Sequence, residues 1–383
     1  MRKCFIASVG VANPHSCTLT HTGEVMAQVG IISAGSWGTA VGSQLGNAGH
    51  AVCMWTREQF VADNINQTHE NKRYLSGYTL SSNVTATTDL DVATKDKELI
   101  ILAMPSLYLV QTVEKLLETE AFKNATNTTD EQKPIIGILS KGFLESPDGQ
   151  PLFITQMLEK MLPPSLSNRL VYISGPSHAE EVVSGKLTGL IGASTNPIAS
   201  IRTREILRSR TLLVYSSLDI IGVQTCAAAK NIIAIAFGML SAMTETSGLF
   251  GDNSEALLLA AGLNEMQTLG KALGATHSET FTSIAGVGDL EVTCRSRFGR
   301  NRKFGIEIVK NNILEKFSGI DDIIKNSERL GYLAEGVPAC KYVHQLAVEK
   351  NVKLQISDAV FRILNKEITV KEFIVKILTG DTN

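Results

Sequence analysis

The chain has 383 residues, enough for two or three domains and a sizeable buried core. Hydrophobic residues make up 44% of it and charged residues 19%, and 36 basic side chains nearly balance 38 acidic ones. This composition argues against a disordered, collagenous or membrane protein, and a formal charge of -2 gives no general attraction to nucleic acid or anionic lipid.

The cysteines and the first residues bear on where the protein resides. Six cysteines, at positions 4, 17, 53, 226, 294 and 340, are widely spaced and form no C-x-x-C pair. A secreted protein held together by disulfide bonds has more closely spaced cysteines, so we interpret these six as reduced thiols in a cytoplasmic protein. The first 25 residues only weakly imitate a secretory signal, because their apolar stretch is short and diluted by Ser8 and Gly10. We expect a disordered tail over residues 1–27, or an upstream start codon with Met26 opening the folded part.

Residues 28–216 alternate short β-branched runs with helical stretches, which is typical of βαβ units around a parallel sheet. The expected strands cover 28–33, 51–55, 98–103, 134–139, 169–174, 187–193 and 212–215, and the expected helices cover 37–48, 106–118, 151–162, 178–184 and 197–208. The pattern predicts a Rossmann-like α/β domain with a mostly parallel sheet.

Residues 217–383 show long helical stretches instead, including 220–243, 254–273 and 335–349, and predict an all-α domain. The longest apolar run, 218–243, contains Asp219, Gln224, Lys230 and Asn231. Hydrocarbon would penalise these side chains heavily, so we expect a buried core helix and no stable membrane insertion.

The first expected strand leads into a turn that resembles a dinucleotide-binding loop. Gly35 and Gly38 stand where the backbone must approach a pyrophosphate and where the helix must pack on the strand, but Ser33 replaces the first glycine of G-x-G-x-x-G. Arg57 follows the second strand, where an NAD enzyme often places an acid. Arg57 is compatible with two interpretations: the site tolerates the 2′-phosphate of NADP, or the arginine is simply a solvent-exposed residue at a helix start.

Ligands of open parallel sheets bind at the carboxyl ends of the strands. Lys141 lies at one such end, and Gly175 follows another. Ser177 and Glu180 have the spacing of a capping box, which predicts a helix start with free backbone N–H groups beside Gly175, although Ser177 alone is more simply explained as a cap. His178 would occupy the first helical position and point outward.

Lys230 is the most informative single residue, because its neighbours at helical spacing are apolar or small. Burial disfavours the charged form of lysine and lowers its pKa, which tunes the amine toward proton transfer near neutral pH. The alternative is a lysine that snorkels to water. We favour the functional interpretation.

Two further clusters lie in the last hundred residues. Asp289 is expected on a glycine-rich turn, where it could orient a lysine or a substrate hydroxyl. A run without any acid then carries Arg295, Arg297, Arg300, Arg302 and Lys303. Guanidinium groups suit phosphate oxyanions, so we expect a small phosphorylated substrate, and the sparse aromatic residues argue against nucleic acid.

Seven segments together resemble the bacterial type of NAD(P)-dependent glycerol-3-phosphate dehydrogenase. They occur in the family's order from about residue 28 to near the C-terminus: Gly-Ser-Trp-Gly-Thr-Ala, Ser-Lys-Gly, Ser-Gly-Pro-Ser-His-Ala-Glu-Glu, Ala-Lys-Asn-Ile-Ile-Ala-Ile, Gly-Asp-Asn, Gly-Val-Gly-Asp-Leu and Gly-Arg-Asn-Arg-Lys-Phe-Gly. The chain departs from the family at Ser33, which would weaken cofactor binding, and at Gly299, where relatives often have serine.

The resemblance implies a role for each matching residue. The implied cofactor-binding residues are Gly35, Ser36, Trp37, Gly38, Arg57, Lys141, Ala179, Arg300 and Glu335, and the implied substrate-binding residues are Lys141, Gly175, Ser177, Lys230, Asp289, Arg300 and Asn301. Lys230 would be the acid–base residue, with Lys141 and Asp289 assisting it. No metal is expected, since no His, Cys and carboxylate set has ligand spacing.

The implied reaction is reversible hydride transfer between NAD(P)H and C2 of dihydroxyacetone phosphate, giving sn-glycerol 3-phosphate for glycerophospholipid synthesis. A homodimer is implied as well. Two alternatives stay open: another two-domain dehydrogenase of the β-hydroxyacid type, or a protein that senses NAD(P)H without turnover. The sequence does not decide between NAD and NADP.

Overall fold

The computed structural model describes residues 26–373, apart from 131, 246, 249 and 297. The tail expected over residues 1–27 therefore lies outside the described residues except for its last two. Of these, Ala27 is buried, and its backbone N–H donates a hydrogen bond to Nδ1 of His50 at 3.1 Å.

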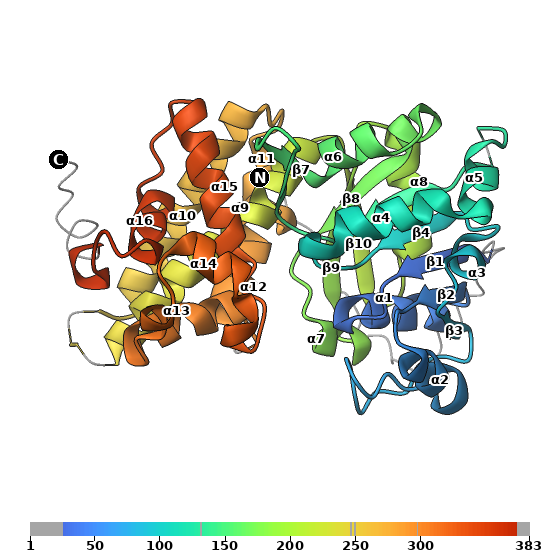
Figure 1. Ribbon diagram of the computed structural model, residues 1–383, viewed down its shortest axis with the longest axis horizontal. Helices are drawn as coiled ribbons and strands as arrows, with labels where there is room; N and C mark the ends of the chain where they lie inside the picture. Colours follow the sequence, from blue (N-terminus) through green and yellow to red (C-terminus); the bar gives the residue numbers. More distant parts are fainter. Residues whose placement is uncertain (1–25, 131, 246, 249, 297, 374–383) are drawn as a thin grey trace, which may run out of the picture.

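The N-terminal part of the described chain contains an eight-stranded sheet in the order β10-β9-β8-β5-β4-β1-β2-β3 (Figure 1). Neighbouring strands are parallel except for β8 and β9, which run antiparallel. The strands are β1 (Gln28–Ile32), β2 (Ala51–Trp55), β3 (Val84–Thr87), β4 (Leu99–Leu102), β5 (Ile135–Ile138), β8 (Leu170–Ser174), β9 (Thr188–Ala193) and β10 (Leu212–Ser217). The predicted fold class, with its mostly parallel sheet, is confirmed.

Helices cover both faces of this sheet, as the apolar central strands require. One face packs on α1 (Ser36–Asn47), α2 (Gln59–Thr68) and α8 (Pro197–Leu207), and the other packs on α4 (Leu109–Glu118) and α6 (Ile154–Met161). Shorter elements complete this part: α3 (Leu90–Thr94), η1 (Ser106–Tyr108), α5 (Glu120–Thr126), η2 (Pro164–Arg169) and α7 (Ala179–Val183).

Three described strands fall outside the predicted set. The edge strand β3 alternates small apolar residues with threonine and pairs only with β2, so its sequence carries little apolar signal. The other two, β6 (Phe143–Glu145) and β7 (Pro151–Phe153), form an antiparallel hairpin. Because β7 pairs with β6, the helix expected from residue 151 begins only at Ile154.

The C-terminal domain is helical and is built around α9 (Ile220–Thr244), which lies beside the sheet domain in Figure 1. Around it lie α10 (Asp252–Leu273), α11 (Glu279–Thr282), η3 (Ile284–Gly288), α12 (Asp289–Arg295), α13 (Arg300–Lys310), η4 (Ile313–Lys316), α14 (Ile320–Lys325), η5 (Ser327–Leu330), α15 (Gly336–Glu349) and α16 (Gln355–Leu364). Within the described residues, α9 is long and apolar enough to cross a membrane, yet 94% of its most apolar window is buried in the protein. The prediction of a core helix is therefore confirmed.

Glycines set the distance between α9 and α13. A Cβ added at Gly238 would lie 2.1 Å from the carbonyl oxygen of Arg302, and one at Gly305 would lie 2.0 Å from that of Ile235. The two helices therefore cross in backbone contact, which brings the start of α13 close to the middle of α9.

The β6–β7 hairpin joins the two domains. Phe143 and Phe153 belong to the hydrophobic cluster of the helical domain, although the hairpin interrupts the sheet domain in sequence. Nε2 of Gln345 on α15 donates a hydrogen bond to the carbonyl of Gly149 at 3.2 Å. Since Lys141 precedes β6 by two residues, this packing also fixes the position of that lysine relative to α15.

Candidate active site

The turn between β1 and α1 has the geometry that a dinucleotide loop needs. Gly35 is the N-cap of α1, and a Cβ at Gly38 would lie 2.3 Å from the carbonyl oxygen of Ser33 and 3.1 Å from Cβ of Ala103. Only glycine allows this close packing of helix on strand. Ser33 itself adopts a φ of 103°, a conformation that favours glycine. The backbone thus retains the turn of the fingerprint although its first glycine is missing.

The side chains expected to reach the cofactor surround this turn. The hydroxyl of Ser36 donates a hydrogen bond to the carbonyl of Tyr74 at 2.6 Å. Trp37 is half-buried and packs against two hydrophobic clusters that both include residues of α1. Arg57 is exposed after β2, with its Cζ 5.4 Å from the ring centroid of Tyr108 after β4. Both strands are neighbours of β1, so these residues flank the carboxyl edge of the sheet.

A buried lysine–aspartate pair lies beside that edge. Nζ of Lys230, in the middle of α9, bonds Oδ1 of Asp289, the first residue of α12. The side chains are only 5% and 2% exposed. Nζ of Lys141 lies 4.0 Å from Oδ2 of Asp289, and Oγ of Ser174 donates to that oxygen at 3.4 Å. The structure thus brings together Lys230, Lys141 and Asp289, which are far apart in the sequence.

Burial and neighbouring charge tune this pair. Burial lowers the pKa of Lys230 from 10.5 to about 8, the charge of Asp289 opposes this change, and the charge of Lys141 adds to it. Burial by itself would raise the pKa of Asp289, but the charges of Lys230 and Lys141 outweigh burial and lower it. The result is an ammonium group that can release or accept a proton near neutral pH beside a carboxylate that stays ionised.

The segment after β8 differs from its predicted capping box. Helix α7 begins at Ala179 with His178 as its N-cap, and the hydroxyl of Ser177 donates to the carbonyl of Gly175 at 2.9 Å. The reason is the backbone of Gly175, whose φ of 131° folds the chain back before the helix starts. A Cβ at Gly175 would lie 2.8 Å from the carbonyl oxygen of Gly189, so no other residue fits there.

Two other predicted placements also need correction. Asp289 does not lie on the glycine-rich turn itself: residues 284–288 form a π-helical turn, and α12 starts directly after it at Asp289. The glycines of this stretch serve tight packing, since a Cβ at Gly286 would lie 2.0 Å from the carbonyl oxygen of Phe281. His178 does not point outward into solvent. It is half-buried, and burial followed by the charge of Lys230 lowers its pKa.

The basic run near residue 300 has partners that its own sequence does not contain. Arg295 pairs with Glu255 of α10 at 2.8 Å and with Glu291 at 3.0 Å. Lys303 pairs with Glu307 at 3.7 Å, and Arg302 reaches the hydroxyl of Ser241 at 3.5 Å. Arg297 lies outside the described residues. Arg300, the first residue of α13, is exposed and forms no ion pair with a described residue. Arg302 also has no carboxylate partner among the described residues but is half-buried, so Arg300 is the exposed guanidinium of this cluster that stays without an ion pair in the described part of the chain.

Asn301 ties three helices together around the site. Its Nδ2 donates to Oδ1 of Asn231 on α9 at 2.9 Å, and its Oδ1 accepts the backbone N–H of Gly336 on α15 at 2.9 Å. Glu335 directly precedes α15 and is half-buried. Ser174 and Asn231 also contact these site residues, although they were not predicted to belong to the site. The sequence signal for them was only that each directly precedes or follows a predicted residue, Gly175 and Lys230 respectively.

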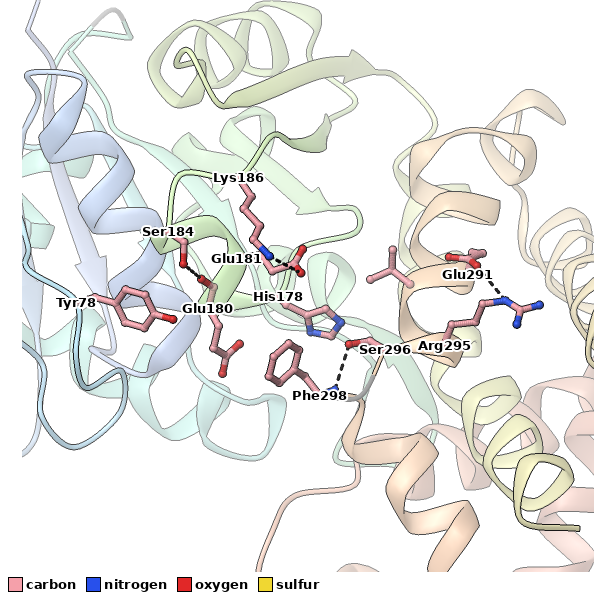
Figure 2. Close-up of a pocket in the computed structure, with 11 residues that line it drawn as sticks. Tyr78, His178, Glu180, Glu181, Ser184, Lys186, Glu291, Arg295, Ser296 and Phe298 are labelled. Carbon is pink, nitrogen blue, oxygen red and sulfur yellow. Dashed lines mark hydrogen bonds and ion pairs between the residues drawn. The ribbon is translucent and has the colours of Figure 1, made fainter. Parts of the chain in front are cut away.

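A cavity of about 550 Å³ opens between α7 and α12 (Figure 2). His178 and Phe298 lie at its centre with ring centroids 5.7 Å apart, while Glu180 and Glu181 lie on the α7 side and Glu291 on the α12 side. The cavity separates the sheet domain from the helical domain. Its size is that of a small-molecule site.

A parallel sheet with a dinucleotide-type turn, facing a buried lysine in a helical domain, defines a two-domain nicotinamide-dependent dehydrogenase. Two family models match the chain: the N-terminal part of NAD-dependent glycerol-3-phosphate dehydrogenase over residues 28–200, and its C-terminal part over residues 219–375. The chain belongs to the NAD-dependent glycerol-3-phosphate dehydrogenase family.

Named relatives agree with this family. A Treponema denticola NAD(P)+ glycerol-3-phosphate dehydrogenase is 57% identical over 355 residues, covering 93% of this chain and 99% of that protein. The protein of the same name from Treponema pallidum (strain Nichols) is 51% identical over 354 residues, covering 92% and 99%. The crystal structure of glycerol-3-phosphate dehydrogenase from Coxiella burnetii has a TM-score of 0.74 at 28% identity, covering 92% of this chain and 99% of that one.

Proposed function

We propose that Lys230 is the acid–base residue in the NAD(P)-dependent interconversion of dihydroxyacetone phosphate and sn-glycerol 3-phosphate, the reaction of the family to which the chain belongs. The observation that carries this assignment is the buried Lys230–Asp289 pair beside Lys141 at the carboxyl edge of the sheet. A lysine with a pKa of about 8 is present in both protonation states near neutral pH, as a reversible reaction requires.

Each residue of the cluster has a distinct task. In the reducing direction Lys230 donates a proton to the oxygen on C2 as negative charge develops there. Lys141 adds positive charge on the same side, and Asp289 holds the Lys230 amine in place. In the oxidising direction the neutral amine of Lys230 removes the proton of the C2 hydroxyl. Ser174 anchors the Asp289 carboxylate throughout.

The turn after β1 fits a dinucleotide pyrophosphate. Gly35 and Gly38 allow close approach of a phosphate, and the positive end of the 12-residue helix α1 faces it. Ser36, Trp37 and Arg57 would bind along this edge, and Lys141, Ala179, Arg300 and Glu335 would bind toward the helical domain. When bound, the nicotinamide supplies the hydride for C2.

Substrate recognition is assigned to the residues that the family resemblance implies. Arg300 would bind the phosphate, because it is free of a carboxylate partner among the described residues and guanidinium groups suit phosphate oxyanions. Gly175, Ser177, Lys141 and Asn301 would line the rest of the substrate site together with the catalytic pair. Asn301 would act mainly through its backbone position, since its side chain is already bonded on both sides.

The test of this function is a ketone panel. Purified protein is mixed with NADH or NADPH and with dihydroxyacetone phosphate, unphosphorylated dihydroxyacetone, a β-ketoacid and an acyl thioester, and nucleotide absorbance is followed. We expect rapid oxidation only with dihydroxyacetone phosphate. Turnover only with the ketoacid or thioester would favour the β-hydroxyacid type, and binding without turnover would favour a sensor.

The role of Lys230 is tested by Lys230→Ala. General acid catalysis contributes roughly 100- to 10,000-fold, so kcat should fall by that factor while the Kd for NADH stays nearly unchanged. Lys271→Ala, at an exposed lysine of α10, is the matched control and should retain full activity. A Lys230→Ala variant with more than a tenth of wild-type kcat would contradict the assignment.

The remaining proposals concern the whole protein. We place the domain boundary at residues 216 and 217, between β10 and α9, and we propose a cytoplasmic homodimer whose product feeds glycerophospholipid synthesis. The widely spaced cysteines support the cytoplasmic location. The two family models, which match residues 28–200 and 219–375, support the domain boundary. Light scattering at several protein concentrations should give twice the chain mass.

A further inference from the structure

Tyr172 is an unusual residue in the wall of the catalytic site. It lies in β8 and is fully buried, and its hydroxyl has no hydrogen-bond partner among the described residues. Buried polar groups are nearly always paired, because an unpaired one loses its hydration without compensation. Phenylalanine would fill the same space without this penalty, so the hydroxyl calls for an explanation.

The side chain of Tyr172 projects toward the catalytic pair. Side chains alternate along a strand, so Tyr172 and Ser174 leave β8 on the same face. Ser174 contacts Asp289 directly, with its Oγ 3.4 Å from Oδ2. Tyr172 also packs in one hydrophobic cluster with Ala227 of α9, which lies about one helical turn before Lys230.

Two carboxylates act on the phenol, but only one of them is free to accept its hydrogen bond. Burial raises the pKa of Tyr172 well above its ordinary value, and the charges of Asp289 and Glu335 raise it further. The phenol is therefore a neutral O–H donor. Asp289 already accepts bonds from Lys230 and Ser174. The Glu335 side chain forms no hydrogen bond or ion pair with a described residue.

Glu335 is anchored beside α9 by its neighbour Gly336. The backbone N–H of Gly336 donates to Asn301 at 2.9 Å, and a Cβ at Gly336 would lie 2.7 Å from the carbonyl oxygen of Asn231. The start of α15 thus rests on α9 next to Lys230. Glu335 belongs to the helical domain, whereas Tyr172 belongs to the sheet domain.

We propose that Tyr172 is a positioning residue for Glu335, and that its hydroxyl donates a hydrogen bond to the Glu335 carboxylate when the two domains close on the dinucleotide. Such a bond would pair a phenol that has no partner among the described residues, and it would therefore favour the nucleotide-bound conformation. This inference rests on the proposed cofactor role of Glu335. It adds a residue that contacts neither nucleotide nor substrate.

The test is Tyr172→Phe, which removes only the hydroxyl. Without nucleotide the Tm should rise by about 1–3 °C, because an unpaired buried group is gone. The Kd for NADH, measured by fluorescence titration, should rise about tenfold, the loss expected for a hydrogen bond to a charged group. A residue that merely stabilises the fold would not move these two readouts in opposite senses. Tyr215→Phe, at a half-exposed tyrosine of β10, is the control and should change neither.

A double-mutant cycle identifies the partner. In the Glu335→Ala background, Tyr172→Phe should leave the Kd for NADH unchanged, since the acceptor is already absent. An equal loss with and without Glu335, or an unchanged Kd in Tyr172→Phe alone, would overturn the inference while leaving the dehydrogenase assignment intact. A wild-type protein that bound neither NADH nor NADPH would overturn both.

Discussion

At the scale of single residues, the site depends on how one amine and one carboxylate share a dry environment. Lys230 would lose its proton too readily if burial acted alone, and Asp289 would gain one. The charge of each group opposes the effect of burial on the pKa of the other. Lys141, whose Nζ lies 4.0 Å from the Asp289 carboxylate, lowers both pKa values. Removal of either charge leaves the other one buried and uncompensated. A substitution that keeps the shape of the side chain, such as Asp289→Asn, tests this charge effect without also creating a cavity.

The pH dependence follows from the pKa of about 8 for Lys230. In ketone reduction the ammonium form is active, so kcat/KM should fall about tenfold per pH unit above pH 8. In alcohol oxidation the neutral amine is active, and kcat/KM should rise up to about pH 8 and then level off. Asp289→Asn removes the charge that raises the pKa of Lys230. The breaks, which are the pH values at which the two kcat/KM profiles change slope, should therefore both move to lower pH.

Steady-state rates between pH 6 and pH 10 in both directions measure these breaks. Glu291→Gln is the matched control, because Glu291 lies two residues further along α12 and is exposed. Its breaks should stay in place. A break that moved to higher pH in Asp289→Asn would contradict the assignment of the titrating group to Lys230.

Ser33 stores backbone strain at the dinucleotide turn. A non-glycine residue in such a conformation costs about 1–3 kcal/mol of folding free energy. Glycine removes this cost, but its larger conformational entropy in the unfolded state offsets part of the gain. Ser33→Gly should therefore raise the free energy of unfolding by about 1 kcal/mol in urea denaturation, and it should tighten NADH binding. Ser33→Ala retains the strain and should be close to wild type. Equal stabilisation by both variants would show that the side chain, and not the φ angle, is responsible.

At the scale of elements, the crossing of α9 and α13 positions two of the site residues. Arg300 and Asn301 open α13, and the glycine contacts at Gly238 and Gly305 hold that helix against α9. The β6–β7 hairpin does the same for Lys141 by inserting Phe143 and Phe153 into the helical core. Packing between elements therefore decides the distances inside the site.

Gly305→Ala tests this crossing. Alanine favours a helix by about 1 kcal/mol over glycine, but its Cβ would lie 2.0 Å from the carbonyl oxygen of Ile235. Overpacking of this kind costs about 1–3 kcal/mol or more, so the clash should win and the protein should lose about 2 kcal/mol in urea denaturation. KM for dihydroxyacetone phosphate should also rise as Arg300 moves. Gly251→Ala has open space around its Cβ and should change stability by less than about 1 kcal/mol.

At the scale of the whole molecule, nucleotide binding should stabilise the folded chain. A ligand that binds only the folded protein stabilises it by about 2.7 kcal/mol at 100 times its Kd. NADH or NADPH at that concentration should raise the Tm by several degrees in differential scanning fluorimetry. Lys230→Ala should show the same rise, since the amine serves catalysis and not nucleotide affinity. An unchanged Tm with both nucleotides would contradict the proposed cofactor site.

The sequence alone was sufficient for features that depend on short-range patterns. The β–turn–α unit around Gly35 and Gly38, the burial of Lys230 in an apolar helix and the mostly parallel sheet all follow from periodicity and glycine placement. Such patterns are local, because one strand or helix presents its buried face through its own residues.

The tertiary structure decided which groups meet. Glu255 neutralises Arg295 from 40 residues away, Gly175 turns the chain so that Ser177 bonds a carbonyl instead of capping a helix, and Asp289 begins a helix against Lys230. These outcomes depend on the distance between elements that pack together in space. Charge pairing, capping and pKa are set by neighbours within a few ångströms, and for these residues the neighbours come from distant parts of the chain.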